Sequence, residues 1–162
     1  MPTQFSQFIN GGNPQAGDRV AGLRNNLNTL FDFSGQGGST LTIPVNQVAH
    51  GLTRGQIVRL NGGTFVTAQA NNAANAEVVG IVSSVVDVNN FVLQFGGLVI
   101  NLIAPTPAYA PLTPGTVYYL DPAVAGNAIA VAPVVPGQIN KPLMVAYTAS
   151  SAFWFNYRGQ VI

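Results

Sequence analysis

The shortness of the apolar runs constrains this sequence more than any other feature. From Thr40 onward, runs of Val, Ile, Leu, Phe and Tyr end within a few residues at Gly, Pro or Asn. This pattern is typical of short strands joined by turns. The corners Asn61-Gly62-Gly63 and Asn89-Asn90 suit tight hairpins, because Gly and Asn tolerate positive φ. We expect strands at residues 40–45, 56–60, 64–69, 76–87, 90–95, 98–103, 116–120, 127–132, 142–148 and 152–157.

Residues 1–38 follow a different pattern. Asp18 suits the N-cap of a short helix, because apolar residues recur after it at spacings of three and four. These apolar residues are Val20, Leu23, Leu27, Leu30 and Phe31. An extended segment precedes the expected helix, and the Gly-rich residues 34–38 suit a linker after it. We predict an N-terminal attachment arm and linker at 1–38 and a β-rich body at 39–162.

An internal similarity divides the predicted body. Leu52–Leu60 and Leu112–Leu120 both begin Leu-Thr-x-Gly and continue into an apolar strand, and residues 77–82 then correspond to 142–147. Chance is the alternative, since Leu-Thr-x-Gly is a common beginning for a strand. We expect two related β units, at 39–104 and 105–162. The predicted fold is therefore mostly β, with an antiparallel β-sandwich or barrel-like body and an N-terminal extended arm that includes a short helix.

Charged residues are unusually rare in this chain. They make up 7% of it, against roughly 25% in an average soluble protein, while hydrophobic residues make up 48%. A monomer depends on surface charge for solubility, so we expect neighbouring subunits to cover much of this surface. The basic residues are scattered and the net charge is +1, which does not favour nucleic acid as a partner. The expected partners are other proteins, including further copies of the chain.

The long uncharged stretch from Val88 to Leu120 is not expected to span a membrane. Pro105, Pro107, Pro111 and Pro114 interrupt it, so no run of about 20 apolar residues remains. The first ten residues lack the basic and apolar regions of a signal peptide. The chain has no cysteine, which excludes disulfides and thiolate chemistry.

Residues for catalysis are sparse. His50 is the only histidine, and a catalytic role for it needs a nucleophile and an orienting acid within reach. Ser83, Ser84 and Asp87 are the conceivable members of such a site, but nothing in their spacing indicates one. We interpret His50 as a histidine of a turn or strand edge whose ring hydrogen-bonds backbone groups.

The acidic residues are well separated along the chain. This spacing favours neither the paired carboxylates of a glycosidase nor the oxygen cluster of a calcium site, and zinc lacks His or Cys clusters. Asp121-Pro122 suits the start of a turn. We therefore expect no enzyme activity, no metal site and no cofactor. The acids are Asp18, Asp32, Glu77, Asp87 and Asp121.

An aromatic segment, Phe153-Trp154-Phe155-Asn156-Tyr157, lies near the end of the sequence. Alternation along a strand places Trp154 on one face and the other three aromatic rings on the opposite face. Aromatic residues on both faces favour a core or a subunit interface. Stacking of a host surface glycan on Trp154 or Tyr157 is the alternative.

Two stretches resemble small structural proteins of tailed bacteriophages. Residues 17–33, GDRVAGLRNNLNTLFDF, are similar to a GD-x-V-x-GLRN-x-x-N-x-x-F-x-F pattern near the N-terminus of tail-fibre and other virion proteins. The two β units, with HGLTRG at 50–55 and LTPGTVYYL at 112–120, resemble the HGLT-x-G and LTPGT-x-YYL modules of the same group. Together these stretches cover most of the chain. The modules recur in fibre, spike, baseplate and capsid-decorating proteins.

The resemblance implies a virion protein that is assembled in the host cytoplasm. It also implies a homo-oligomer, often a homotrimer, that docks on other virion proteins of the tail or capsid through its N-terminal segment. Arg24 suits a partner's carbonyl or carboxylate. Packing of the arm against its own body is the alternative. The docking candidates are Asp18, Arg19, Leu23, Arg24, Asn28, Phe31 and Phe33.

The expected function is that of a structural component of a tailed-phage virion, either a short tail fibre or a fibre-base protein. A capsid decoration (cement) protein and a host-glycan-binding module are the alternatives. The sequence departs from a full tail fibre in its length, without a long repetitive shaft or an added receptor-binding or depolymerase domain. Receptor recognition is therefore left open. A glycan hydrolase, as a third class, lacks the paired acids that it needs.

Overall fold

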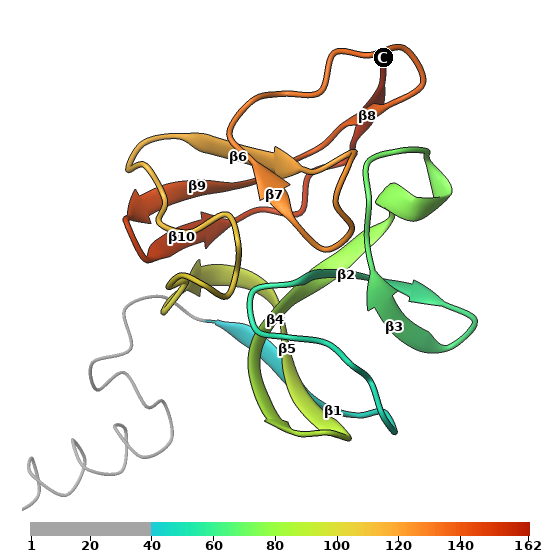
Figure 1. Cartoon of the computed structure of the whole chain (residues 1–162), viewed down its shortest axis with the longest axis vertical. Coiled ribbons are helices and arrows are strands. Elements are labelled where there is room, and N and C mark those ends of the chain that lie inside the picture. Colours follow the sequence, from blue (N-terminus) through green and yellow to red (C-terminus); the bar gives the residue numbers. More distant parts are fainter. Residues whose placement is uncertain (1–39) are drawn as a thin grey trace, which may run out of the picture. The chain divides into compact units, whose positions relative to one another are not determined.

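A computed structural model describes residues 40–162 (Figure 1). The prediction of a mostly β, antiparallel fold is confirmed, and the main sheet curls into a half-barrel. A single turn of 3-10 helix, η1, covers Ala74–Ala76. The strands are β1 (Leu41–Asn46), β2 (Ile57–Asn61), β3 (Thr64–Thr67), β4 (Val78–Asp87), β5 (Asn90–Val99), β6 (Val117–Leu120), β7 (Ala128–Ile129), β8 (Ile139–Asn140), β9 (Pro142–Thr148), β10 (Ser151–Trp154) and β11 (Gln160–Val161). The expected helix after Asp18 lies outside the described residues.

The strand β5 joins the two halves of the sheet. The sequence predicted two strands here, broken at Gly96-Gly97, but β5 continues through both glycines. It pairs with β1 and β4 before this point and with β10 at Gly97–Val99. The buried side chain of Gln94 explains the continuity, because its amide nitrogen donates to the carbonyls of Gly96 (3.0 Å) and Leu98 (3.1 Å). One side chain thus satisfies two backbone groups where β5 changes partners.

Other strands differ from their predicted lengths. The strands β7 and β10 are shorter than expected, at Ala128–Ile129 and Ser151–Trp154, whereas β9 matches its predicted range. The pair β8 and β11 was not predicted, because two residues give no recognisable pattern.

One predicted hairpin turn is confirmed and the other is built differently. Gly62 and Gly63 both have positive φ, 56° and 87°, and connect β2 to β3. The turn between β4 and β5 needs no positive φ. There the carboxylate of Asp87 accepts hydrogen bonds from the backbone of Asn89 (2.7 Å) and the side chain of Asn90 (2.9 Å).

The two halves of the sheet have the same plan. The hairpins β2–β3 and β4–β5 correspond to β6–β7 and β9–β10, with β2 paired to β4 and β6 paired to β9. The strand order β3-β2-β4-β5-β10-β9-β6-β7 is therefore the same from both ends. The described residues thus contain two β units of related topology, joined edge to edge at β5 and β10.

Irregularities in pairing recur at corresponding positions of the two units. The register shifts after Val58 in β2 and after Tyr118 in β6. Likewise, the pairing with the following strand skips Ser83 in β4 and Tyr147 in β9. A β-bulge is a specific local feature, so two shared bulges are strong support for a common plan.

The backbone contacts refine the alignment of the two units. Gly55 and Gly115 donate to the carbonyls of Val82 and Ala146, both at 2.8 Å. Val82 therefore corresponds to Ala146, whereas the sequence comparison aligned it with Tyr147. Both segments are mostly apolar, so an alignment of similar letters does not distinguish this register from one shifted by a single residue.

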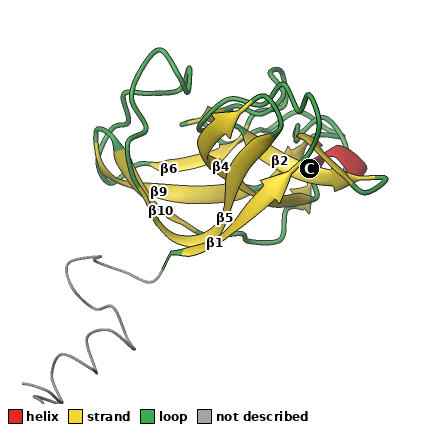
Figure 2. Ribbon diagram, turned by 90° about the horizontal axis from the view of Figure 1, so that it is seen from below, coloured by secondary structure: helices red, strands yellow, loops and turns green. Residues whose placement is uncertain are grey.

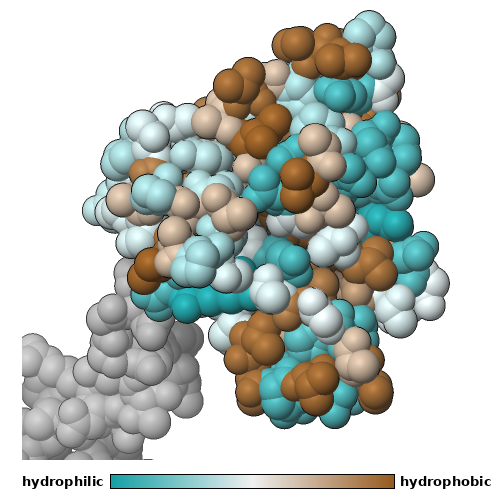
Figure 3. Space-filling view, in the orientation of Figure 1, coloured by the Kyte–Doolittle hydropathy of each residue, from teal (hydrophilic) through white to brown (hydrophobic). Residues whose placement is uncertain are grey.

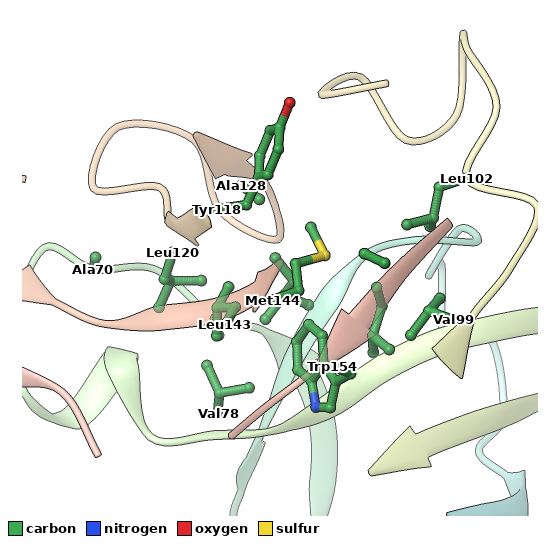
Figure 4. Close-up of a cluster of buried hydrophobic side chains, with 14 of the residues drawn as sticks. Ala70, Val78, Val99, Leu102, Tyr118, Leu120, Ala128, Leu143, Met144 and Trp154 are labelled. Carbon is green, nitrogen blue, oxygen red and sulfur yellow. The ribbon is translucent and has the colours of Figure 1, made fainter. Parts of the chain in front are cut away.

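The larger of two hydrophobic clusters unites both halves (Figure 4). Ile57 and Ile81 of the first half are fully buried in it with Leu143 and Met144 of the second. Figure 4 shows Met144 and Trp154 close together between Leu143 and Val99. Because neither half closes this core alone, the two units fold as one body.

A smaller cluster lies inside the first half. All five strands β1–β5 contribute to it, with Phe91 and Leu93 at its centre. The side chain of Gln47, just after β1, closes the ring of strands: it accepts from the backbone N–H of Phe65 in β3 (2.7 Å) and donates to the carbonyl of the same residue (3.0 Å). The first half is thus barrel-like. Its sheet continues from β5 into β10, β9 and β6, as Figure 2 shows.

Candidate functional site

Charged side chains are few in the described part of the chain. Lys141 is 5% exposed, and burial lowers the pKa of its ammonium group, although the charge of Glu77 opposes the shift. Residues 40–162 contain no group of three His, Asp or Glu side chains placed to hold a metal ion. The charged residues of this region are Arg54, Arg59, Glu77, Asp87, Asp121, Lys141 and Arg158.

Many large apolar side chains are exposed, and Figure 3 shows them as separate groups among polar residues. One group lies at the β4–β5 turn, where Val86 and Val88 are 69% and 66% exposed. A second group lies around β11 and the loop before β8, and includes Val134, Val135 and Val161. Apolar patches of this kind, with few charges beside them, are typical of surfaces that bind other proteins.

A third exposed group lies on the hairpin β9–β10. Tyr147 and Phe153 are 60% and 42% exposed, and their ring centroids lie 5.3 Å apart. Aromatic side chains are enriched in protein interfaces because a rigid ring buries a large area at a small entropic cost. Sequence reasoning did not single out Tyr147, although alternation along β9 places it on the same face as Val145.

The structure separates the two aromatic residues that were candidates for glycan stacking. Trp154 is 3% exposed and lies in the larger core (Figure 4), so its ring offers no face to a sugar. Tyr157 is 58% exposed, and its ring stacks on Phe155 with centroids 5.6 Å apart. Of the two, only Tyr157 is placed to meet a ligand.

His50 is held by backbone groups on both sides of its ring. Its Nδ1 accepts a hydrogen bond from the N–H of Leu52 (2.9 Å), so Nε2 carries the proton and donates to the carbonyl of Asp87 (3.0 Å). The ring also packs on Phe91, with centroids 4.9 Å apart. The interpretation of His50 as a turn histidine is confirmed, because both ring nitrogens bind backbone.

The two acids at turns have backbone and amide partners. The Asn90 side chain and the Asn89 backbone hold the pKa of the Asp87 carboxyl below its ordinary value. Asp121 accepts from the backbone of Ala123 (2.7 Å) and from Asn127 (2.9 Å), which confirms it as the start of a turn. Both carboxylates therefore act as structural acceptors in these turns.

A pocket of about 200 Å³ lies where residues 105–108, in the loop between β5 and β6, meet the loops before β2 and before β7. Its walls are residues 105–108, residues 124–127, Thr53 and Gln56. Two of its polar side chains are already engaged: the Gln56 oxygen accepts from the Thr53 backbone (2.9 Å), and Asn127 donates to Asp121. None of the residues that line the pocket is charged.

The docking candidates of the N-terminal segment lie outside the described residues. They are Asp18, Arg19, Leu23, Arg24, Asn28, Phe31 and Phe33.

No helix within residues 40–162 is long and apolar enough to cross a membrane. Neither the models of protein families, nor the curated proteins, nor the solved structures gave a match.

Proposed function

We propose that this chain is a non-catalytic structural subunit that works by assembling with other protein chains. The exposed apolar surface of the β body, combined with so few charged side chains, is the observation that carries this proposal. An isolated protein with such a surface is prone to non-specific association, whereas a subunit covers it in the assembly.

The particle proposed for this subunit is the virion of a tailed bacteriophage. The support is the resemblance of residues 17–33 and of the two Leu-Thr-x-Gly segments to virion proteins. The proposed place is a short tail fibre or the base of a fibre, in a homotrimer docked through the N-terminal segment. Capsid decoration is the alternative within the same class.

Quantitative mass spectrometry of gradient-purified phage particles tests this role. We expect the chain to co-purify with infectious particles at a fixed ratio to the major capsid protein. A low copy number per particle indicates the tail, and a high copy number indicates the shell. Absence of the chain from the particles contradicts the virion role.

Glycan binding is a second candidate, favoured by the exposed ring pair of Phe155 and Tyr157. If it is correct, host surface polysaccharide binds saturably, and Tyr157→Ala weakens binding by about 1 kcal/mol, roughly fivefold. Val131→Ala is the matched control, because Val131 is also exposed, at 75%, and has no aromatic ring. Equal binding by both variants and the wild type excludes stacking on Tyr157.

A further inference from the structure

A row of apolar side chains crosses the second half of the sheet. Val117 in β6 pairs with Val145 in β9, Val145 with Phe153 in β10, and Phe153 with Leu98 in β5. Neighbouring strands lie about 4.8 Å apart, so this row spans roughly 14 Å. The Tyr147 ring lies beside Phe153. We call these five residues the outer face.

The outer face is exposed, yet it carries no charge. Phe153 and Tyr147 are exposed, and the other three residues are half-buried. No charged residue occurs anywhere in β5, β6, β9 or β10. An antiparallel sheet that faces water usually has polar side chains on that face. The outer face thus has the composition of a covered surface.

In the first half of the sheet, the face that corresponds to the outer face is buried. There Ile57 pairs with Ile81, and Ile81 with Gln94, at the positions of Val117, Val145 and Phe153. Their side chains are 0%, 0% and 3% exposed. Ile57 and Ile81 lie in the larger core with residues of the second half. The same face is therefore buried in one unit and open in the other.

We infer that a second copy of this chain covers the outer face. Within the chain, the corresponding face is covered by another β unit of the same plan, and a second copy supplies further units of this kind. Two identical copies also meet here without like charges, which otherwise oppose self-association. The inference rests on the proposed assembling role and adds the residues that carry the contact.

Light scattering on the full-length chain over a range of concentrations tests the contact. We expect an oligomer whose dissociation constant rises by at least about tenfold in Phe153→Asp, because the new charge would be buried without a partner. Val131→Asp is the matched control, since Val131 is exposed and lies off the outer face, and it should keep the wild-type mass. Circular dichroism shows whether each variant is folded.

Two outcomes overturn the inference. One is a wild-type chain that keeps the mass of a single 16.9 kDa chain at every concentration. The other is a Phe153→Asp oligomer as tight as the wild type. If Phe153→Asp does not fold, Tyr147→Asp decides in its place, because Tyr147 is 60% exposed and a charge there does not disturb the core.

Cross-linking identifies what covers the face. The chain has no cysteine, so Tyr147→Cys accepts a single photoreactive benzophenone label. In a mixture of light and heavy isotope-labelled copies, we expect cross-links that join residue 147 of a light copy to residues 40–162 of a heavy copy, and the reverse. Cross-links only to residues 1–39, or none between copies, contradict the inference. The virion role is tested separately on purified particles, so either can fail without the other.

Discussion

Gly55 and Gly115 occupy corresponding positions in the two β units and make the same hydrogen bond. Their φ angles are 80° and 79°. Gly55, just before β2, donates to β4, and Gly115, just before β6, donates to β9. Both positions thus need glycine for the backbone. They differ in their surroundings, because Gly55 lies against Pro107 and Gly115 has open space.

Alanine at these two glycines separates backbone strain from crowding. Gly115→Ala should lower the free energy of unfolding by about 1–2 kcal/mol, because only the positive φ is disturbed. Gly55→Ala should cost about 1–3 kcal/mol more, because its Cβ would lie 2.6 Å from Pro107. Urea unfolding of both variants measures the difference. Equal losses would show that Pro107 moves aside freely.

The aromatic residues near the end of the sequence divide into core and surface. Trp154→Ala should lower the free energy of unfolding by about 3–5 kcal/mol, since Trp154 is 3% exposed in the larger core. Tyr157→Ala should change it by no more than about 0.5 kcal/mol, since Tyr157 is 58% exposed. Thermal and urea unfolding check both values. A stable Trp154→Ala variant would contradict the assignment of Trp154 to the core.

At the scale of elements, the first β unit is closed by a side chain instead of a strand pair. β1 and β3 exchange no ladder hydrogen bonds, and the Gln47 carboxamide provides the two bonds to Phe65. A carboxamide has a donor and an acceptor, so it imitates a residue of a neighbouring strand. Gln47 therefore supplies the hydrogen bonds at this edge, while Val45 and Phe65 pack against the same hydrophobic cluster.

Gln47→Ala should open that edge. We expect the two lost hydrogen bonds to cost about 1–3 kcal/mol and the backbone amide of Phe65 to exchange with deuterium faster. Gln47→Glu is the conservative control: it keeps the acceptor for the Phe65 N–H and loses the donor. Hydrogen exchange followed by NMR measures the effect. Unchanged protection at Phe65 in Gln47→Ala would show that packing alone closes the barrel.

At the scale of the whole molecule, burial of titratable groups shapes the dependence of stability on pH. Tyr109 donates its hydroxyl to the carbonyl of Gly55 (2.8 Å), and burial raises the pKa of this hydroxyl above its ordinary value of 10.0. Burial lowers the pKa of the Lys141 ammonium group, so the free energy of unfolding rises as the pH rises toward 10.5. The raised pKa of Tyr109 has the opposite effect on stability.

Stability should therefore fall as the pH rises above about 10.5. There the Tyr109 phenol ionises in the unfolded chain and keeps its proton in the folded chain, which costs at most about 1.4 kcal/mol per pH unit. Urea unfolding at several alkaline pH values measures this slope. In Tyr109→Phe the slope should be smaller, although the lost hydrogen bond lowers stability at every pH. The same slope in both proteins would assign the effect to other groups.

The sequence by itself determined the class of fold, most strands and the local turns. Short apolar runs, Gly62-Gly63 and Asp121 act through neighbouring residues, so their structural roles are visible without tertiary contacts. The similarity of the two Leu-Thr-x-Gly segments likewise predicted two related units. The fine alignment of the units was wrong by one residue, because residues 77–82 and 142–147 are both mostly apolar and match almost equally well in neighbouring registers.

Only the tertiary structure decided what each face of the sheet touches. Alternation separates Trp154 from Phe153, but it does not show that the larger core lies on the side of Trp154 and leaves Phe153 exposed. The continuity of β5 through Gly96-Gly97 depends on Gln94. The closure of the barrel-like first half depends on the hydrogen bonds between Gln47 and Phe65. These outcomes arise from contacts between residues far apart in the chain. Burial is a property of the assembled sheet, so local patterns alone do not determine it.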